Sequence, residues 1–265
     1  MDKKYYFISG LPRSGSTLLV NLLNQNPRFY ASGTSGIMDV MFGVRNQWDK
    51  LIEFQANKRV EEKRRVLKAI FEVYYSGIEK PVIFDKCRGW LSLIEMAEEV
   101  LDQQIKILVP VRDIRDVLAS FEKLWRKQSK LSQVPTEASN YFQFQTVEGR
   151  CFIWANADQP IGLAYNRIKD AIQRGYRNRL HFVKFNQFTS FPKTTMKGIY
   201  RFLEEEYFEH DFDHIEQVIF ENDEVYGYTD LHTIQSKIEP KKSDWIQVIG
   251  KEVGMKYQGL NLWDE

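Results

Sequence analysis

The residues best suited to bind an anion lie near the N-terminus, in the segment GLPRSGSTLL that runs from Gly10 to Leu19. An apolar run with high β propensity, residues 5–8, precedes this segment, and a helical pattern begins at Thr17. In a strand–loop–helix unit of this kind, backbone N–H groups converge on one point at the positive end of the helix dipole. The segment therefore predicts a phosphate or sulfate site.

The same segment lacks the residues of a nucleoside triphosphate site. Gly10 and Gly15 have the spacing of a P-loop, which continues with a lysine for the β- and γ-phosphates and a hydroxyl for magnesium. Here Ser16 stands at the lysine position, and the positive charge is carried by Arg13. An ordinary NTPase is therefore disfavoured. The alternative is a tight turn that binds nothing, and the coincidence of glycines, hydroxyls and Arg13 argues against it.

A second candidate anion site follows the apolar run 105–111. Arg112 leaves the carboxyl end of this predicted strand, where open α/β sheets bind their ligands. A guanidinium there can bind a phosphate with two parallel hydrogen bonds, and the hydroxyl of Ser120 could add a donor. Taken alone, these residues fit a helix start capped by Asp113 better than a binding site.

Together the two segments resemble the PAPS-dependent sulfotransferase family, whose donor is 3′-phosphoadenosine 5′-phosphosulfate (PAPS). The sequence Pro-Arg-Ser-Gly at 12–15 is most similar to the tyrosylprotein and related bacterial branch. The resemblance implies that the first segment holds the 5′-phosphosulfate and the second the 3′-phosphate, with no metal required. The cofactor-binding residues that it implies are Arg13, Ser14, Gly15, Ser16, Thr17, Leu18, Arg112, Ser120 and Arg126.

Sulfuryl transfer requires neutralisation of charge on the transferred group and removal of the acceptor's proton. The resemblance implies that Arg13 and Lys86 contact the sulfuryl group; a solvated or ion-paired role for Lys86 is as compatible with the sequence. At the position of the base in the tyrosylprotein branch this chain has Thr34, so tyrosine sulfation is disfavoured. Asp39 is the predicted base and Asp85 the second candidate, although a capping role in the first turn of a helix is the preferred interpretation of Asp39.

The hydrophobic pattern predicts the elements that position these residues. Strands are expected at residues 5–8, 82–84, 105–111 and 181–185, and helices at 17–23, 90–101, 114–126 and 192–203. Strands that alternate with helices predict an α/β fold, a parallel β-sheet flanked by helices on both faces in a P-loop-like three-layer sandwich. The length fits a single sulfotransferase domain, residues 1–265. Residues 221–242 are expected to form an irregular loop that folds over another part of the molecule.

Composition limits the classes of partner and compartment. The chain has 265 residues, 43% of them hydrophobic, and a formal net charge of +1, which excludes disorder over most of its length and a general nucleic-acid surface. Two cysteines cannot build a disulfide framework. No run approaches the ~20 apolar residues of a membrane span, and no signal peptide is evident. The prediction is a soluble, cytoplasmic protein.

Two other groups of residues are assigned to structure rather than to function. His210 and His214 have metal-ligand spacing, but without a third ligand an acidic helix entry is the preferred interpretation. A cluster of aromatic residues could line an acceptor pocket, although core packing is preferred. This cluster contains Trp125, Tyr141, Phe142 and Phe144.

The predicted function is transfer of the PAPS sulfuryl group to a hydroxyl or amine by in-line displacement. The acceptor class stays open among small molecules, carbohydrates, lipids and peptides, and so does the oligomeric state. Two alternatives remain: a divergent P-loop kinase for a small metabolite, and a nucleotide-binding module without turnover.

Overall fold

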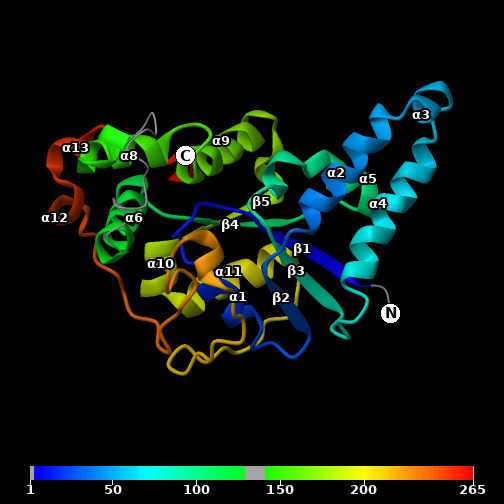
Figure 1. The fold of residues 1–265 in the computed structure, drawn as a ribbon. Helices are drawn as coiled ribbons and strands as arrows, with labels where there is room; N and C mark the ends of the chain where they lie inside the picture. Colours follow the sequence, from blue (N-terminus) through cyan, green and yellow to red (C-terminus); the bar gives the residue numbers. More distant parts are fainter. Residues whose placement is uncertain (1–2, 129–140, 265) are drawn as a thin grey trace.

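The structure is a computed structural model that describes residues 3–128 and 141–264. Its centre is a parallel five-stranded sheet with the order β2-β3-β1-β4-β5 (Figure 1). The strands are β1 (Lys4–Ile8), β2 (Phe29–Thr34), β3 (Val82–Lys86), β4 (Ile107–Val111) and β5 (Leu180–Lys184). The predicted α/β class with a parallel sheet is confirmed.

The central strands are apolar on both faces because helices cover both faces. Along β1, Tyr6 and Ile8 pack into one apolar cluster, whereas Tyr5 and Phe7 pack into another on the opposite face. This alternation follows from the two-residue period of a strand. It gives the three-layer arrangement that the sequence predicts.

The helices divide between the two faces of the sheet (Figure 1). One face is covered by α1 (Ser16–Leu23), α10 (Phe185–Ser190) and α11 (Pro192–Leu203). The other is covered by α2 (Ile37–Lys50), α4 (Val60–Tyr74), α5 (Ile94–Leu101), α6 (Ile114–Gln128), α8 (Val147–Ala155) and α9 (Pro160–Gln173). Shorter helices are α3 (Ile52–Ala56), α7 (Tyr141–Phe144), α12 (Trp245–Ile249) and α13 (Lys251–Met255), with 3-10 turns η1 (Trp90–Ser92), η3 (Tyr176–Arg179), η4 (Asp223–Tyr226) and η5 (Leu262–Asp264).

Some element predictions were wrong. Strand β2 was missed because Ser32 and Gly33 interrupt its apolar pattern, and the helix expected at 90–101 is divided into η1 and α5. The helix-entry interpretation of His210 also fails, since no helix begins between residues 205 and 222. His210 is instead buried, with its Nε2 3.0 Å from the hydroxyl of Tyr200.

The aromatic cluster is only partly in the core. Trp125 is buried and its ring stacks on that of Phe144 at a centroid distance of 5.2 Å, as the core interpretation requires. Phe142, by contrast, is 76% exposed. All four aromatic residues are among those that the structure describes, and none of them lines the cavity at the carboxyl ends of the strands.

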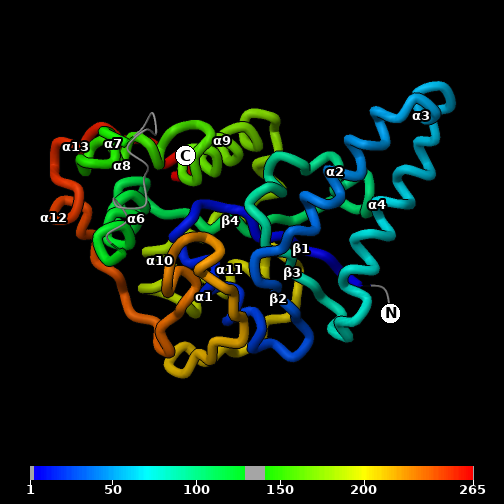
Figure 2. Tube along the Cα trace, in the orientation of Figure 1, coloured from blue at the N-terminus to red at the C-terminus, as the bar shows by residue number. Residues whose placement is uncertain are grey.

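Residues 204–244, which join α11 to α12 and are called the strap here, form no α-helix or β-strand. The strap passes on the α1 side of the sheet before it reaches α12 (Figure 2). It is fastened to α1 by the side-chain oxygen of Asn21, which accepts hydrogen bonds from the backbone N–H groups of Val218 (2.7 Å) and Ile219 (3.3 Å). The prediction that 221–242 is an irregular segment folded over another part of the molecule is confirmed.

Candidate active site

The loop between β1 and α1 needs its two glycines for different reasons. A side chain at Gly10 would bring its Cβ within 2.2 Å of the carbonyl oxygen of Pro110, so only glycine lets the loop pass β4 this closely. Gly15 has a φ of +85°, in the left-handed region that glycine adopts without cost. Arg13 also has a positive φ, 57°, and such strained residues concentrate at functional sites.

Ser14 contributes to the loop differently from the other predicted residues. Its hydroxyl is buried and lies within hydrogen-bond distance of the carbonyl oxygens of Leu11 (2.5 Å) and Pro110 (3.0 Å). The side chain thus anchors the loop to β4 and is committed to the protein itself. Any contact of Ser14 with a ligand would have to use its backbone N–H.

A cavity of about 550 Å³ opens at the carboxyl ends of the strands, between the β1–α1 loop and the strap. It brings together most of the residues that the sequence analysis selected. Those that line it are Arg13, Gly15, Ser16, Thr17, Leu18, Lys86, Arg112 and Ser120. Ser14, Asp39 and Arg126 are described residues that do not line it.

The two predicted anion segments meet inside this cavity. Arg13 Nε donates a hydrogen bond to Ser120 Oγ (3.1 Å), and Arg112 Nη1 lies 3.5 Å from the carbonyl oxygen of Arg13. The Arg112 guanidinium stacks on the ring of Phe185 at 4.5 Å, which fixes its plane. Residues 13 and 112, 99 positions apart in the chain, therefore occupy one site.

Both arginines are placed to attract a polyanion. Burial lowers the pKa of Arg13, and the nearby Arg112 cation lowers it further. Burial also lowers the pKa of Arg112, whose Nε is buried without a hydrogen-bond partner. Within residues 3–128 and 141–264, neither guanidinium forms an ion pair with a carboxylate. Two adjacent cations without a paired carboxylate create a local positive potential, although the whole chain is nearly neutral.

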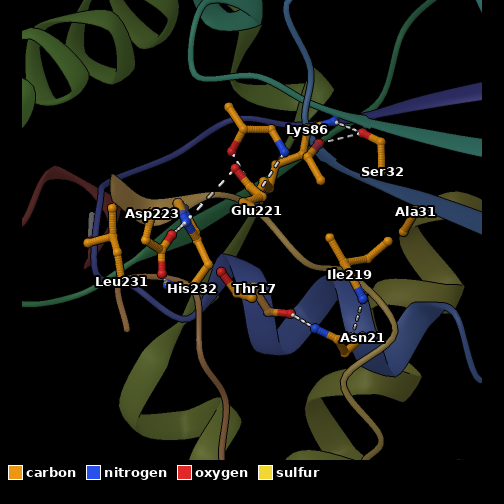
Figure 3. Close-up of polar contacts among 12 residues, drawn as sticks. Thr17, Asn21, Ala31, Ser32, Lys86, Ile219, Glu221, Asp223, Leu231 and His232 are labelled. Atoms are coloured by element: carbon orange, nitrogen blue, oxygen red, sulfur yellow. Dashed lines mark hydrogen bonds and ion pairs between the residues drawn. The ribbon is translucent and has the colours of Figure 1, made fainter. Parts of the chain in front are cut away.

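Lys86, the last residue of β3, is paired with a residue of the strap (Figure 3). Its Nζ lies 2.9 Å from Glu221 Oε1, and the two side chains are only 8% and 10% exposed. Burial lowers the pKa of Lys86. For Glu221 burial opposes ionisation, but the Lys86 ammonium and hydrogen bonds from Thr34 outweigh it and lower the pKa to about 2. In this conformation Lys86 therefore has the ion-paired role that the sequence left open as an alternative.

Neither predicted general base lies in the cavity. Asp39 is exposed in the first turn of α2, where its charge complements the helix dipole. Asp85 is fully buried and accepts hydrogen bonds from the Trp90 indole N–H (2.6 Å) and the Tyr75 hydroxyl. Burial raises the pKa of Asp85, so this carboxyl belongs to the core.

Arg126, predicted to reach the 3′-phosphate, has a structural role instead. Its Nε donates to Glu122 Oε1 (2.7 Å) and its Nη2 to the carbonyl oxygen of Val248 (2.7 Å). The bond to Val248 ties α6 to α12. The periodicity of α6 directs Arg126 away from the cavity that Ser120 lines, because six residues advance a helix by about 240°.

Three residues of the strap at or beside the cavity were not predicted: His232, which lines it, and its neighbours Glu221 and Asp223. Asp223 Oδ1 lies 2.6 Å from His232 Nδ1, and its other oxygen accepts the backbone N–H of His232 at 3.0 Å. No motif or periodicity marks these residues. The one available signal was the expected folding of 221–242 over another part of the molecule.

Comparison with known proteins identifies relatives of this architecture. A sequence model described as "Sulfotransferase family" matches residues 6–209. The sulfotransferase domain of the Synechococcus PCC 7002 olefin synthase is 16% identical, with a TM-score of 0.52 and 94% of each chain covered. A retinol dehydratase solved with androsterone and the inactive cofactor PAP is 14% identical, with a TM-score of 0.54, and the alignment covers 98% of this chain and 80% of that one. No curated protein matches the sequence. No helix among the described residues is long and apolar enough to cross a membrane.

Proposed function

Since this chain belongs to the sulfotransferase family, we propose that it transfers the sulfuryl group of PAPS to a hydroxyl or amine acceptor. One observation carries the proposal: Arg13, Arg112 and Ser120 converge on a cavity at the N-terminus of α1. A helix N-terminus and two guanidiniums fit a ligand with two separate anionic ends. The tyrosylprotein-type branch stays a prediction, as does a single domain over the full length.

In the proposed complex, the two anionic ends of PAPS have different partners. The backbone N–H groups of residues 15–18, with Arg13, bind the 5′-phosphosulfate, and Arg112 and Ser120 bind the 3′-phosphate. The Ser120 oxygen accepts the bond from Arg13, so its own hydrogen can be donated to a phosphate oxygen. The PAP molecule named for the retinol dehydratase structure supports a bisphosphate ligand in this fold.

The transfer proceeds by in-line displacement. The acceptor oxygen or nitrogen forms a bond to sulfur while the bond from sulfur to the 5′-phosphate oxygen breaks, and the adenosine bisphosphate leaves with that electron pair. Arg13 and Lys86 stabilise the charge on the transferred group. Without PAPS, Glu221 Oε1 is bound to Lys86 Nζ. When PAPS binds, a sulfuryl oxygen replaces Glu221 Oε1 as the partner of Lys86.

The acceptor and the surroundings of the enzyme are proposed at a coarser level. Small-molecule, carbohydrate, lipid and peptide acceptors all stay within the proposal, and the androsterone and retinol named for retinol dehydratase structures favour a small molecule. We retain the prediction of metal-independent transfer. The cytoplasmic location also stays a prediction, with which two free, buried cysteines are compatible.

Calorimetry with 3′,5′-bisphosphoadenosine (PAP) and with ATP–Mg²⁺ tests the proposed function. We expect PAP to bind at least about 100-fold more tightly, a difference of about 2.7 kcal/mol, because two cations face its separate phosphates. Transfer of ³⁵S from labelled PAPS to a panel of alcohols, phenols and amines then tests for turnover. Preference for ATP–Mg²⁺ would favour a kinase, and PAP binding without transfer to any acceptor would favour a binding module.

Glu221→Gln is expected to tighten PAPS binding about tenfold and to leave PAP binding within a factor of three. The substitution removes a negative charge that competes with the sulfuryl group for Lys86, and PAP has no sulfuryl group. Calorimetry measures the affinity for PAP. Single-turnover kinetics, measured as a function of PAPS concentration, gives the affinity for PAPS. Glu239→Gln is the matched control, because Glu239 lines the same cavity but is exposed. An equal gain in both variants would mean that net charge alone is responsible.

The Lys86–Glu221 pair also predicts a pH dependence of stability without ligand. A carboxyl whose pKa is lower in the folded than in the unfolded protein stabilises the fold above its unfolded pKa, and this contribution is lost as pH falls. For Glu221 the window runs from about pH 5 to about pH 2. We expect the melting temperature of wild type to fall more steeply through this window than that of Glu221→Gln. Parallel curves would contradict the assigned pair.

A further inference from the structure

We propose that His232, held by Asp223, is the general base that takes the proton from the acceptor. This inference rests on the proposed function, since it assigns a role within the same cavity. His232 belongs to the strap, far in sequence from the phosphate loop and from Lys86. His232 would therefore supply the general base that the two predicted carboxylates, Asp39 and Asp85, do not.

The contacts of His232 fix both the position and the tautomer of its ring. Nδ1 lies 2.6 Å from Asp223 Oδ1, and the backbone N–H donates to Asp223 Oδ2 at 3.0 Å (Figure 3). The ring also packs edge-on against that of Tyr226 at a centroid distance of 5.5 Å. A carboxylate can only accept, so the neutral imidazole donates from Nδ1. Its Nε2 then carries the lone pair, as a base requires. A hydrogen bond from Nδ1 to a carboxylate is the arrangement that orients catalytic histidines.

The neighbours of His232 place it beside the predicted position of the sulfuryl group. The carbonyl oxygen of Leu231, the preceding residue, accepts a hydrogen bond from Arg13 Nη1. On the other side, Glu221 Oε2 is 3.9 Å from His232 Nδ1, and Glu221 Oε1 is bonded to Lys86. His232 thus lines the cavity between the two cations that stabilise the transferred group.

Three carboxylates that line the cavity are engaged elsewhere or exposed: Asp116 accepts a hydrogen bond from Ser243 Oγ (2.7 Å), Asp244 pairs with Lys123, and Glu239 is exposed. Glu221, which lies beside the cavity, is also poorly suited as a base. The Lys86 ammonium and two donors of Thr34 bind its Oε1, and its pKa is about 2. A group this acidic gives little driving force for proton removal near neutral pH, because the efficiency of a general base rises with its basicity. Burial excludes Asp85. A neutral imidazole is therefore the better base.

In the proposed step, His232 Nε2 takes the proton of the acceptor O–H or N–H as the new bond to sulfur forms. The bond between sulfur and the 5′-phosphate oxygen breaks, and PAP departs with its electron pair. The imidazolium is stabilised by Asp223, which stays ionised: burial opposes this, but the two hydrogen bonds from His232 lower the pKa of Asp223. The proton returns to solvent after the sulfated product leaves.

His232→Gln tests the assignment when transfer from ³⁵S-labelled PAPS is measured to two acceptors. Water must lose a proton to react, whereas 4-nitrophenol is already ionised at mildly alkaline pH and needs no base. We expect transfer to water to fall about 100-fold, transfer to 4-nitrophenolate to fall less than threefold, and PAP affinity to be unchanged. Asp223→Asn, which disturbs the tautomer, should lower transfer to water about tenfold. It provides a second test if His232→Gln does not fold.

The strap contains a matched control, His214, which contacts Asp211 in a similar way: Nδ1 lies 3.2 Å from Asp211 Oδ2, and the backbone N–H donates to Oδ1 at 2.9 Å. The side chain of His214 is 84% exposed and does not line the cavity, so His214→Gln should leave both rates unchanged.

Three results would overturn the assignment. Equal losses for water and 4-nitrophenolate in His232→Gln, or no loss for either, would exclude His232 as the base while the proposed function stands. Wild-type protein that binds PAP but transfers to neither acceptor would also contradict the base and would favour the binding module without turnover. Wild-type protein that does not bind PAP would contradict the proposed function itself.

Discussion

Arg112→Ala should weaken binding of PAP by about 100- to 1000-fold and binding of adenosine 5′-phosphate by less than threefold. Two hydrogen bonds from a guanidinium to a phosphate contribute about 3–4 kcal/mol when the site is shielded from water, which corresponds to this factor. Adenosine 5′-phosphate has no 3′-phosphate, so it does not depend on them. Calorimetry with the two ligands measures both affinities.

The state of Arg112 without ligand sharpens this prediction. Its Nε is buried without a partner, and its pKa is lowered by burial, so the free protein keeps a partly desolvated cation that the phosphate would satisfy. Removing the guanidinium should therefore cost little stability, within about 1 kcal/mol in the free energy of unfolding. PAP should raise the melting temperature of wild type far more than that of the variant.

Arg115→Ala is the control for a general loss of positive charge on α6. Arg115 is three residues further along, is paired with Asp113 at 2.6 Å and does not line the cavity. Its replacement should change PAP affinity by less than a factor of two. If Arg112→Ala weakened both nucleotides equally, Arg112 would not be the 3′-phosphate ligand, and the proposed orientation of PAPS would be wrong.

The sequence predicted best what is encoded locally. The phosphate loop is a short segment whose glycines, hydroxyls and arginine must lie together, and Gly10 and Gly15 have the close approach and the positive φ that such a loop needs. Arg112 follows a wholly apolar strand, and parallel strands carry their carboxyl ends to one edge of the sheet. These two facts place each residue at the ligand-binding edge of the sheet, and the family resemblance then predicted that positions 13 and 112 bind one ligand.

The sequence predicted poorly what depends on how the strap packs. Glu221 and His232 come from a segment without helix or strand, so no period indicates which side chains face inward. Their positions depend on contacts such as that of Asn21 with Val218 and Ile219, which join residues almost 200 positions apart. Ser14 shows a related limit: its type fits a phosphate ligand, but only the three-dimensional structure reveals that β4 and the loop itself bind its hydroxyl.

Lys86→Met should lower kcat for sulfuryl transfer by about 1000-fold, with PAP affinity changed less than threefold. The lysine contacts the group that carries charge in the transition state, and removal of one such donor costs about 10²–10³ in kcat. PAP lacks the sulfuryl group, so its affinity should not depend on Lys86. Rapid-quench measurement of ³⁵S transfer, with calorimetry for PAP, separates the two effects.

The buried pair of Lys86 with Glu221 allows this catalytic effect to be separated from an effect on folding. Lys86→Met leaves the Glu221 carboxylate buried without its ammonium partner, held only by neutral donors of Thr34 and Tyr226, so we expect a loss of about 3 kcal/mol in the free energy of unfolding. The double variant Lys86→Met, Glu221→Gln removes both charges and should recover most of that stability. It should not recover kcat, because the cation is still missing. If it did, Lys86 would act only as the partner that holds the strap in place, and stabilisation of the sulfuryl group would have to come from Arg13 alone.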